Sequence, residues 1–241
     1  MTIKQDHPAP DSTVLSDLTL SRASTAERAA DVLRRLILRG ELQPGSPMRE
    51  AKLAGTLGVS PNTMREALRI LGTEGLLVQG RHRVATVVRL EPDDVVEIFV
   101  VRRALELAAL DELAASGREP DLKRLDGAIS RFRSFGADDE WLHVIDADRE
   151  FHSAIVALAD NRRLEALYAH CDAEIRLCLG ITTRLHIDVK ELTNQHEALL
   201  EQLRTGSFST FRTDLARTLD EARDRVIAVL NGEQEVPDTP S

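Results

Sequence analysis

The side chains in the second half of the chain that are best suited to binding chemistry are Asp148, His152 and His196. Asp148 and His152 lie four residues apart, so a helix would place them one above the other on one face, directed at the same cation or anion. Carboxylate oxygens and imidazole nitrogens are ligands of first-row transition metals. The same spacing also fits a hydrogen-bonded structural pair, which is the more common arrangement, so spacing alone leaves both interpretations open.

Arg102 is a second candidate for ligand binding, because it lies in an acidic and helical part of the chain. A guanidinium can bind both oxygens of a carboxylate at once, so an arginine inside an acidic bundle is a natural partner for an organic acid. The alternative is an i, i+4 ion pair with Glu106 on a solvated helix face.

The stretch LAGTLGVSPNTMREALRILGTEGLL, residues 53–77, predicts a short helix, a tight turn and a longer helix. Gly58 supplies the backbone freedom for the turn, Ser60 is a suitable N-cap, and Pro61 fits the first position of the second helix. The second helix has an apolar stripe formed by Met64, Ala67, Leu68 and Leu71. Its outward positions can meet base edges and phosphates in a major groove, together with Ser60 at its start: Asn62, Thr63, Arg65 and Arg69.

An αα-hairpin with glycine at its turn also occurs in helical proteins that never bind DNA. Here two short apolar runs, residues 76–78 and 84–88, follow the hairpin and predict two strands joined by a turn at 79–83. The tip of this β-wing carries Arg81, His82 and Arg83, donors that an ordinary turn does not need. Helix, turn, helix and basic wing together favour a DNA-binding domain.

The formal net charge of −9 is divided unevenly along the chain. Residues 1–90 hold 13 Lys and Arg against 9 Asp and Glu, a net +4, whereas residues 91–241 hold 18 against 31, a net −13. Phosphate attracts the first part and repels the second, so we expect DNA binding only in the first part.

The composition also indicates the compartment. Cys171 and Cys178 are too few for a disulfide framework, and their spacing of seven suggests reduced thiols on one helix face. The N-terminal MTIKQDHPAP lacks the apolar core of a signal peptide, and no apolar run approaches membrane-spanning length. The sequence therefore predicts a cytoplasmic protein with no membrane partner.

The predicted fold class is mainly α, with an N-terminal winged helix-turn-helix domain followed by an all-α helical bundle. Residues 1–23 and 232–241 are expected to be disordered tails. Residues 24–90 form the winged domain, whose first helix is expected to be capped by Thr25. Residues 91–231 have helical periodicity throughout and predict the bundle. Its expected helices lie near 93–116, 120–136, 138–159, 161–184, 187–204 and 208–231.

The order ILRGELQPGSPM, LAGTLGVS, MREALRILGTEGLL and a basic wing resembles the N-terminal domain of the GntR family of bacterial transcription factors, over roughly residues 25–88. The resemblance is most specific at residues 57–60 and 65–68. The family usually has an Arg after the Ser of the turn, where this chain has Pro61, and often a Gly in the wing, where this chain has Val84. The resemblance thus implies the fold but not the operator sequence. Arg65 is retained and is the expected DNA contact.

The pattern D-x-x-F-H at 148–152, Asn161 and His196 resembles the C-terminal effector domain of the FadR-type (FCD) branch of this family, and Arg102 and Glu106 fit its first helix. The resemblance implies a dimerising domain that binds a small organic acid, often beside a metal held by one Asp and three His. Asp148, His152 and His196 match three of these ligands, and the fourth position falls on Thr218. A divalent metal, zinc or nickel, is therefore expected to bind weakly or only together with the acid. The competing interpretation is an acid bound directly, with Arg102 supplying the positive charge.

These observations predict a ligand-responsive transcriptional regulator, a repressor, that acts as a homodimer on a pseudo-palindromic double-stranded DNA operator. Its effector-binding residues would be Arg102, Asp148, His152 and His196. A metal-dependent enzyme using Asp148, His152 and His196 is the alternative from another class. A DNA-binding protein whose bundle only dimerises is the third interpretation.

Overall fold

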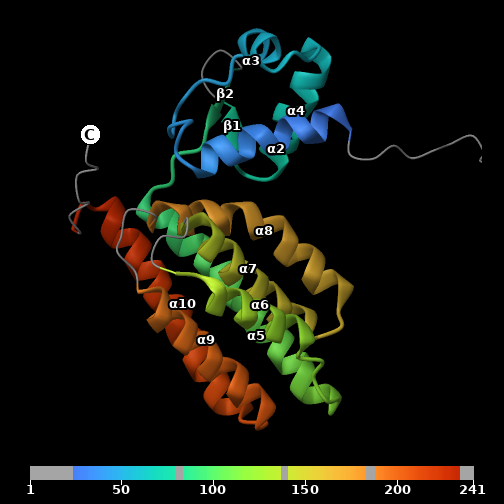
Figure 1. Cartoon of the computed structure of the whole chain (residues 1–241), viewed down its shortest axis with the longest axis vertical. Coiled ribbons are helices and arrows are strands. Elements are labelled where there is room, and N and C mark those ends of the chain that lie inside the picture. The colour runs from blue at the N-terminus through green and yellow to red at the C-terminus, as the bar shows by residue number, and fades with distance from the viewer. Residues whose placement is uncertain (1–23, 80–83, 137–140, 183–187, 234–241) are drawn as a thin grey trace, which may run out of the picture.

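The computed structural model describes the following residues: 24–79, 84–136, 141–182 and 188–233. The expected N-terminal tail, the tip of the expected wing with Arg81, His82 and Arg83, and residues 234–241 of the expected C-terminal tail lie outside the described residues. Figure 1 shows a small domain with helices and two strands above a larger bundle of helices. No helix among the described residues is long and apolar enough to cross a membrane.

The small domain is a winged helix-turn-helix. In chain order its elements are α2 (Thr25–Leu38), α3 (Glu50–Leu57), α4 (Pro61–Thr73), β1 (Leu77–Gln79) and β2 (Ala85–Val87). The two strands pair antiparallel, with Leu77 opposite Val87. This arrangement confirms the predicted fold class of the N-terminal part.

The helix ends of this domain follow from local capping chemistry. At α4, the Ser60 hydroxyl accepts a hydrogen bond from the backbone N–H of Thr63, and Pro61 occupies the first position, as predicted. At α2 the expected cap, Thr25, is wrong. Ser24 is the N-cap instead, because its hydroxyl accepts from the Glu27 N–H while the Glu27 carboxylate accepts from the Ser24 N–H, which satisfies two otherwise unpaired donors at once.

The core of the small domain lies between α2 and α4. Met64, Ala67 and Leu71 are fully buried on the inner face of α4, as the apolar stripe predicted, and they pack in one cluster with Ala30 and Leu33 of α2. The opposite face of α4 stays exposed. Burial on one face therefore fixes which side chains the recognition helix presents outward.

The bundle contains six helices within the described residues, each close to a predicted segment. They are α5 (Pro92–Ser116), α6 (Lys123–Ser134), α7 (Trp141–Ala157), α8 (Arg162–Ile181), α9 (Val189–Arg204) and α10 (Phe208–Leu230). Asn161 caps α8 and Asp188 caps α9 through side-chain oxygens. The all-α prediction for this part is confirmed.

Helix α8 lies along the top of the bundle, next to the small domain, as Figure 1 shows. Its Ala173 and Leu177 pack against the core of the small domain. Further along, a Cβ on Gly180 would lie 3.6 Å from the carbonyl oxygen of Leu38, so the end of α2 approaches this helix closely. One helix thus belongs to the bundle and also supports the DNA-binding domain.

Candidate effector site and DNA-binding face

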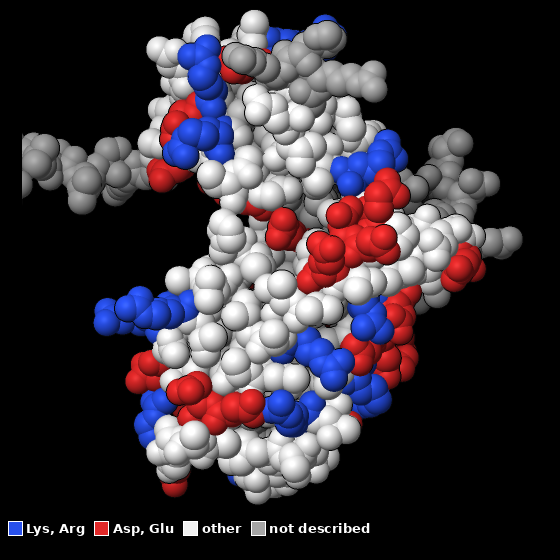
Figure 2. All heavy atoms as spheres, turned by 180° about the vertical axis from the view of Figure 1, so that it is seen from behind, with Lys and Arg blue, Asp and Glu red and all other residues white. Residues whose placement is uncertain are grey.

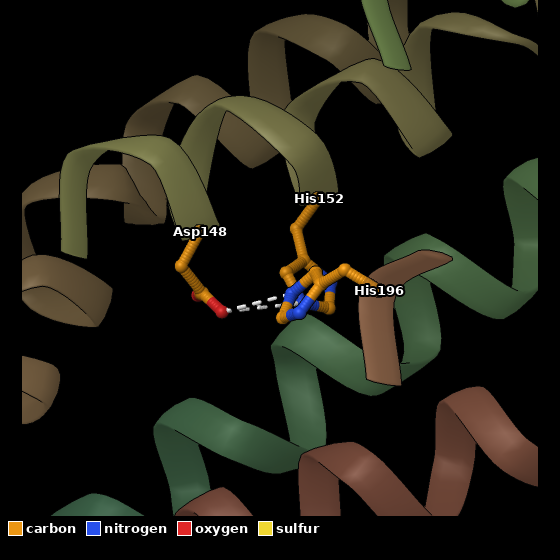
Figure 3. Close-up of side chains that lie close together, drawn as sticks. All are labelled: Asp148, His152 and His196. Carbon is orange, nitrogen blue, oxygen red and sulfur yellow. Dashed lines mark ion pairs between the residues drawn. The ribbon is translucent and has the colours of Figure 1, made fainter. Parts of the chain in front are cut away.

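A cluster of polar and charged side chains is buried where α5, α7, α8 and α9 meet. Glu106 and His196 are fully buried, and the Asp148 side chain is 14% exposed. Figure 3 shows Asp148 and His152 pointing from one helix toward His196 on another. The members of the cluster are Arg102 and Glu106 from α5, Asp148 and His152 from α7, Tyr168 from α8 and His196 from α9.

The hydrogen bond of His152 to Glu106 fixes which imidazole nitrogen carries the proton. Nδ1 of His152 lies 2.7 Å from Oε2 of Glu106. Burial disfavours the charged form of Glu106, but His152 and Arg102 outweigh it and lower the pKa of this carboxyl. Because an ionised carboxylate can only accept, Nδ1 donates, and in the neutral imidazole Nε2 then keeps its lone pair. That Nε2 lies 3.8 Å from Oδ1 of Asp148.

His196 has the same arrangement with a different partner. Its Nδ1 lies 2.7 Å from the carbonyl oxygen of Leu192, one turn earlier in α9, so Nδ1 is again the donor. Nε2 lies 3.2 Å from Oδ1 of Asp148, and in the neutral ring it has no hydrogen-bond partner among the described residues. In the neutral imidazole the lone pair of this Nε2 would repel the carboxylate oxygen, whereas a protonated Nε2 attracts it and lowers the pKa of the Asp148 carboxyl. A cation between them, either a proton or a metal ion, would remove the repulsion.

Asp148, His152 and His196 could hold a metal ion, because each offers one ligand atom and these atoms all lie within 4.8 Å of one another. Ligand atoms about 2.0–2.2 Å from a zinc ion stand roughly 3–4 Å apart from each other. The separations of 3.2 and 3.8 Å from the Asp148 oxygen to the two imidazoles fit that range. Glu106 and the Leu192 carbonyl act as the outer partners that orient metal-binding imidazoles.

Thr218, at the fourth ligand position of the family pattern, offers no equivalent donor. It is buried on α10, and its hydroxyl donates a 2.9 Å hydrogen bond to the carbonyl oxygen of Asp214. The side chain is neutral and engaged with its own helix. The chain therefore supplies one oxygen and two nitrogens at this site, with room in the coordination sphere for water or a ligand.

Arg102 lies beside these residues with one nitrogen unused. Nε is 2.9 Å from Glu106, Nη2 is 3.4 Å from Asp148, and Nη1 is buried without a partner. The expected alternative, an i, i+4 pair with Glu106, does form, but the expected solvated face is wrong because the two side chains are 1% and 0% exposed. The apolar surroundings of α5 bury the pair.

The net charge of the cluster depends on the protonation of its two imidazoles. Burial disfavours ionisation of Asp148, but His152, His196 and Arg102 outweigh it and lower the pKa of this carboxyl. Two carboxylates, Glu106 and Asp148, thus face one guanidinium, which leaves an excess of one negative charge when both imidazoles are neutral. Because an uncompensated buried charge is costly, the site favours an added cation.

The outward face of α4 carries the predicted DNA-contacting side chains. Arg65 is 63% exposed, and its guanidinium lies 3.0 Å from Glu50 of α3 and 3.2 Å from Asn62. Arg69 is also exposed and forms two hydrogen bonds with Glu66. Exposed ion pairs of this kind contribute little stability, so both arginines can exchange their partners for phosphate or base edges.

The start of α4 combines a helix cap with a backbone suited to binding an anion. Ser60 caps the helix and its hydroxyl lies 2.8 Å from that of Thr63, while Asn62 is exposed. The helix N-terminus, with its free N–H groups, is itself suited to an anion such as phosphate. Figure 2 shows both basic and acidic side chains on the small domain and on the bundle.

A winged helix-turn-helix joined to an all-α bundle, with three largely buried side chains that could hold a metal ion, is the organisation of a two-domain transcriptional regulator. A model of the gntR family of bacterial regulatory proteins matches residues 25–88, and a model of the FCD domain matches residues 97–230. The chain belongs to the GntR family of transcriptional regulators, in the branch with an FCD domain. Membership of this family makes it a regulator and not an enzyme.

Relatives of similar organisation include operon repressors. The chain is 25% identical over 215 residues to the gluconate operon transcriptional repressor of Bacillus subtilis (strain 168), covering 86% of this chain and 87% of that protein. It is 27% identical over 187 residues to a probable D-xylose utilization operon transcriptional repressor of Paenarthrobacter nicotinovorans, covering 78% and 82%. A crystal structure of a putative transcriptional regulator GntR from Rhodococcus sp. RHA1 superimposes with a TM-score of 0.72 at 26% identity, covering 86% and 99%.

Sequence reasoning missed the roles of two members of the cluster. The sequence predicted Glu106 as a partner of Arg102 and as part of the first helix of the effector domain, but not as an acceptor for His152 and for the Tyr168 hydroxyl, the latter at 3.1 Å. The sequence signal for the burial of Glu106 was its position as a charged residue in a helix whose other residues are mostly apolar. Tyr168 had no signal, because only the packing of α8 against α5 brings it near.

Proposed function

We propose that this protein is a transcriptional repressor that binds its operator as a homodimer and whose DNA affinity is controlled by a small organic acid bound in the bundle. The observation that carries the proposal is the buried cluster, in which two imidazole nitrogens, the Asp148 carboxylate and the Nη1 of Arg102, unpartnered among the described residues, lie together. Such a regulator acts on the chromosome, in the bacterial cytoplasm.

We propose a zinc or nickel ion held by Asp148, His152 and His196 as part of this site. A divalent cation would change the net charge of the cluster from −1 to +1, which one carboxylate of an acid would then neutralise. The bound ion would supply a positive charge and open coordination positions for that carboxylate. Arg102 would donate to the same carboxylate through Nη1. With only three protein ligands, the metal and the acid should bind more tightly together than apart.

The DNA-binding function rests on the small domain. The proposed contacts are Arg65 and Arg69, with Ser60, Asn62 and Thr63 at the start of α4, and the wing residues Arg81, His82 and Arg83. In a dimer, two such domains would read half-sites about one helical turn, roughly 34–36 Å, apart. Repression of a neighbouring operon agrees with the relatives, which are named as operon repressors.

The proposed route of regulation is α8. Leu179 of this helix lines the cavity beside Asp148, while Ala173 and Leu177 pack against the DNA-binding domain. An acid that moves α8 would therefore change the position of the recognition helix. It would release DNA to the extent that it binds the DNA-free arrangement more tightly.

Fluorescence anisotropy with a labelled DNA fragment from the region upstream of the gene tests the proposal. Operator affinity is measured with and without a panel of short carboxylic acids, in zinc and in chelator, for the wild type and His196→Ala. We expect at least one acid to change the affinity tenfold or more in the wild type only. Unchanged affinity in every acid, with DNA binding intact, would show that the bundle only dimerises.

A further inference from the structure

A small cavity lies next to the buried cluster and shares Asp148 with it. Its volume is about 40 Å³, more than the roughly 10–15 Å³ needed to hold one water. Val144, Leu179 and Leu192 are among its apolar wall residues, and Trp141 and Arg225 also line it. The cavity is therefore an apolar space with a carboxylate at one side and two hydrogen-bond donors in its wall.

Arg225 differs from the other arginines of α10. Arg212, Arg217 and Arg223 each form an ion pair with an acidic side chain. Among the described residues no carboxylate lies within ion-pair distance of Arg225, which is half-buried. Because it follows Thr218 by seven residues, it lies on the same face of the helix two turns further on. A half-buried guanidinium without a carboxylate is suited to binding one from a ligand in two hydrogen bonds.

Trp141 provides a second unsatisfied donor in the same wall. Its indole Nε1 is buried and has no hydrogen-bond partner within the part of the chain that the structure describes. Indole N–H can only donate, and buried donors in native proteins nearly always have an acceptor. Beside the same cavity, therefore, the Trp141 indole lacks an acceptor and Arg225 lacks a carboxylate partner.

We propose that Arg225 and Trp141 form a second anchor for the effector, and that the effector is a short dicarboxylic acid. One carboxylate binds at the Asp148 cluster, where Arg102 has its free Nη1. The methylene groups contact the apolar walls, and the second carboxylate accepts from Arg225 and Trp141. A monocarboxylic acid of equal length leaves both donors unpaired. This inference rests on the proposed function, because the first anchor is the proposed effector site.

Isothermal titration of the full-length protein with matched acids tests the second anchor. The pairs are malonate with propionate, succinate with butyrate, and glutarate with valerate, in which a methyl group replaces the second carboxylate. They are titrated into the wild type, Arg225→Gln, Arg217→Gln and His196→Ala. Arg217 is the matched control, because it is an arginine of the same helix that is exposed and paired with Glu221.

We expect the wild type and Arg217→Gln to bind one dicarboxylate at least tenfold more tightly than its matched monoacid. Arg225→Gln should reduce that preference to threefold or less while the monoacid binds as before, and His196→Ala should weaken both acids. A preference that survives in Arg225→Gln, or no preference in the wild type, overturns the second anchor. If His196→Ala still weakens both acids in that case, the proposed function stands; if no acid binds the wild type, both fail.

Discussion

Glu106→Gln is the substitution that separates a metal-binding cluster from a merely structural one. Glu106 accepts from Nε of Arg102 at 2.9 Å, from Nδ1 of His152 at 2.7 Å and from the Tyr168 hydroxyl at 3.1 Å. A glutamine has one acceptor oxygen and one NH₂ donor. If its oxygen keeps Arg102 and Tyr168, its NH₂ faces the Nδ1–H of His152, donor against donor. His152 must then move its proton to Nε2 and loses the lone pair that binds metal.

Two magnitudes follow from this geometry. Removing one partner of a buried ion pair costs about 3–5 kcal/mol of unfolding free energy, because Arg102 stays buried. Losing the outer carboxylate of a metal-binding histidine weakens metal affinity about 10–100-fold. Tyr168→Phe is the control, because it removes one hydrogen bond to a charged group, about 1.5–3 kcal/mol, and leaves the His152 proton in place.

Denaturant unfolding of the metal-free proteins and zinc titration of the folded ones give the two quantities separately. We expect Glu106→Gln to lose stability and zinc affinity, and Tyr168→Phe to lose stability alone. A folded Glu106→Gln protein with wild-type zinc affinity would refute the assignment of the His152 proton and the metal site built on it.

Arg65→Ala should weaken operator binding by the roughly 1–3 kcal/mol of a lost base contact without affecting the dimer, and unchanged affinity in anisotropy would contradict this. Neutralising Arg81 and Arg83 should weaken binding to all DNA sequences and flatten the plot of log affinity against log salt; an unchanged slope would argue against phosphate contact. Thr218→His should tighten zinc binding by adding a fourth ligand, and equal affinity in a competition titration would show that this position does not reach the metal. Leu177→Ala should leave acid affinity unchanged but reduce the effect of the acid on DNA binding, measured as the ratio of operator affinities with and without acid.

The fold was predictable because its signals are local. The stripe of Met64, Ala67 and Leu71, the cap at Ser60 and the helical periods of the bundle depend on residues within one or two turns, and the structure has them where the pattern indicated. Thr25 was a wrong cap for a local reason too. Ser24 and Glu27 form a reciprocal pair that the single residue preference did not take into account.

The cluster was only partly predictable because it is built across helices. The i, i+4 spacing of Asp148 and His152 could be derived, since both lie on α7. That Glu106 would orient His152, or that Arg225 would line a cavity with Asp148, depends on how α5, α7 and α10 pack. A charged residue on a helix is expected to be solvent-exposed unless its tertiary neighbours are known. For this reason the sequence predicted the Arg102–Glu106 pair on a solvated helix face, whereas the pair is buried.

The position of α8 explains how a site in the bundle can influence DNA binding without a long chain of contacts. Leu179 lines the cavity, and the next residue, Gly180, faces the carbonyl oxygen of Leu38 at the end of α2. A ligand in this cavity and the DNA-binding domain would thus contact adjacent residues of one helix. Leu107→Ala is the matched control for Leu177→Ala, because Leu107 packs against the bundle core and not the small domain. If both variants lose the effect of the acid equally, general destabilisation explains the loss and α8 is not the route.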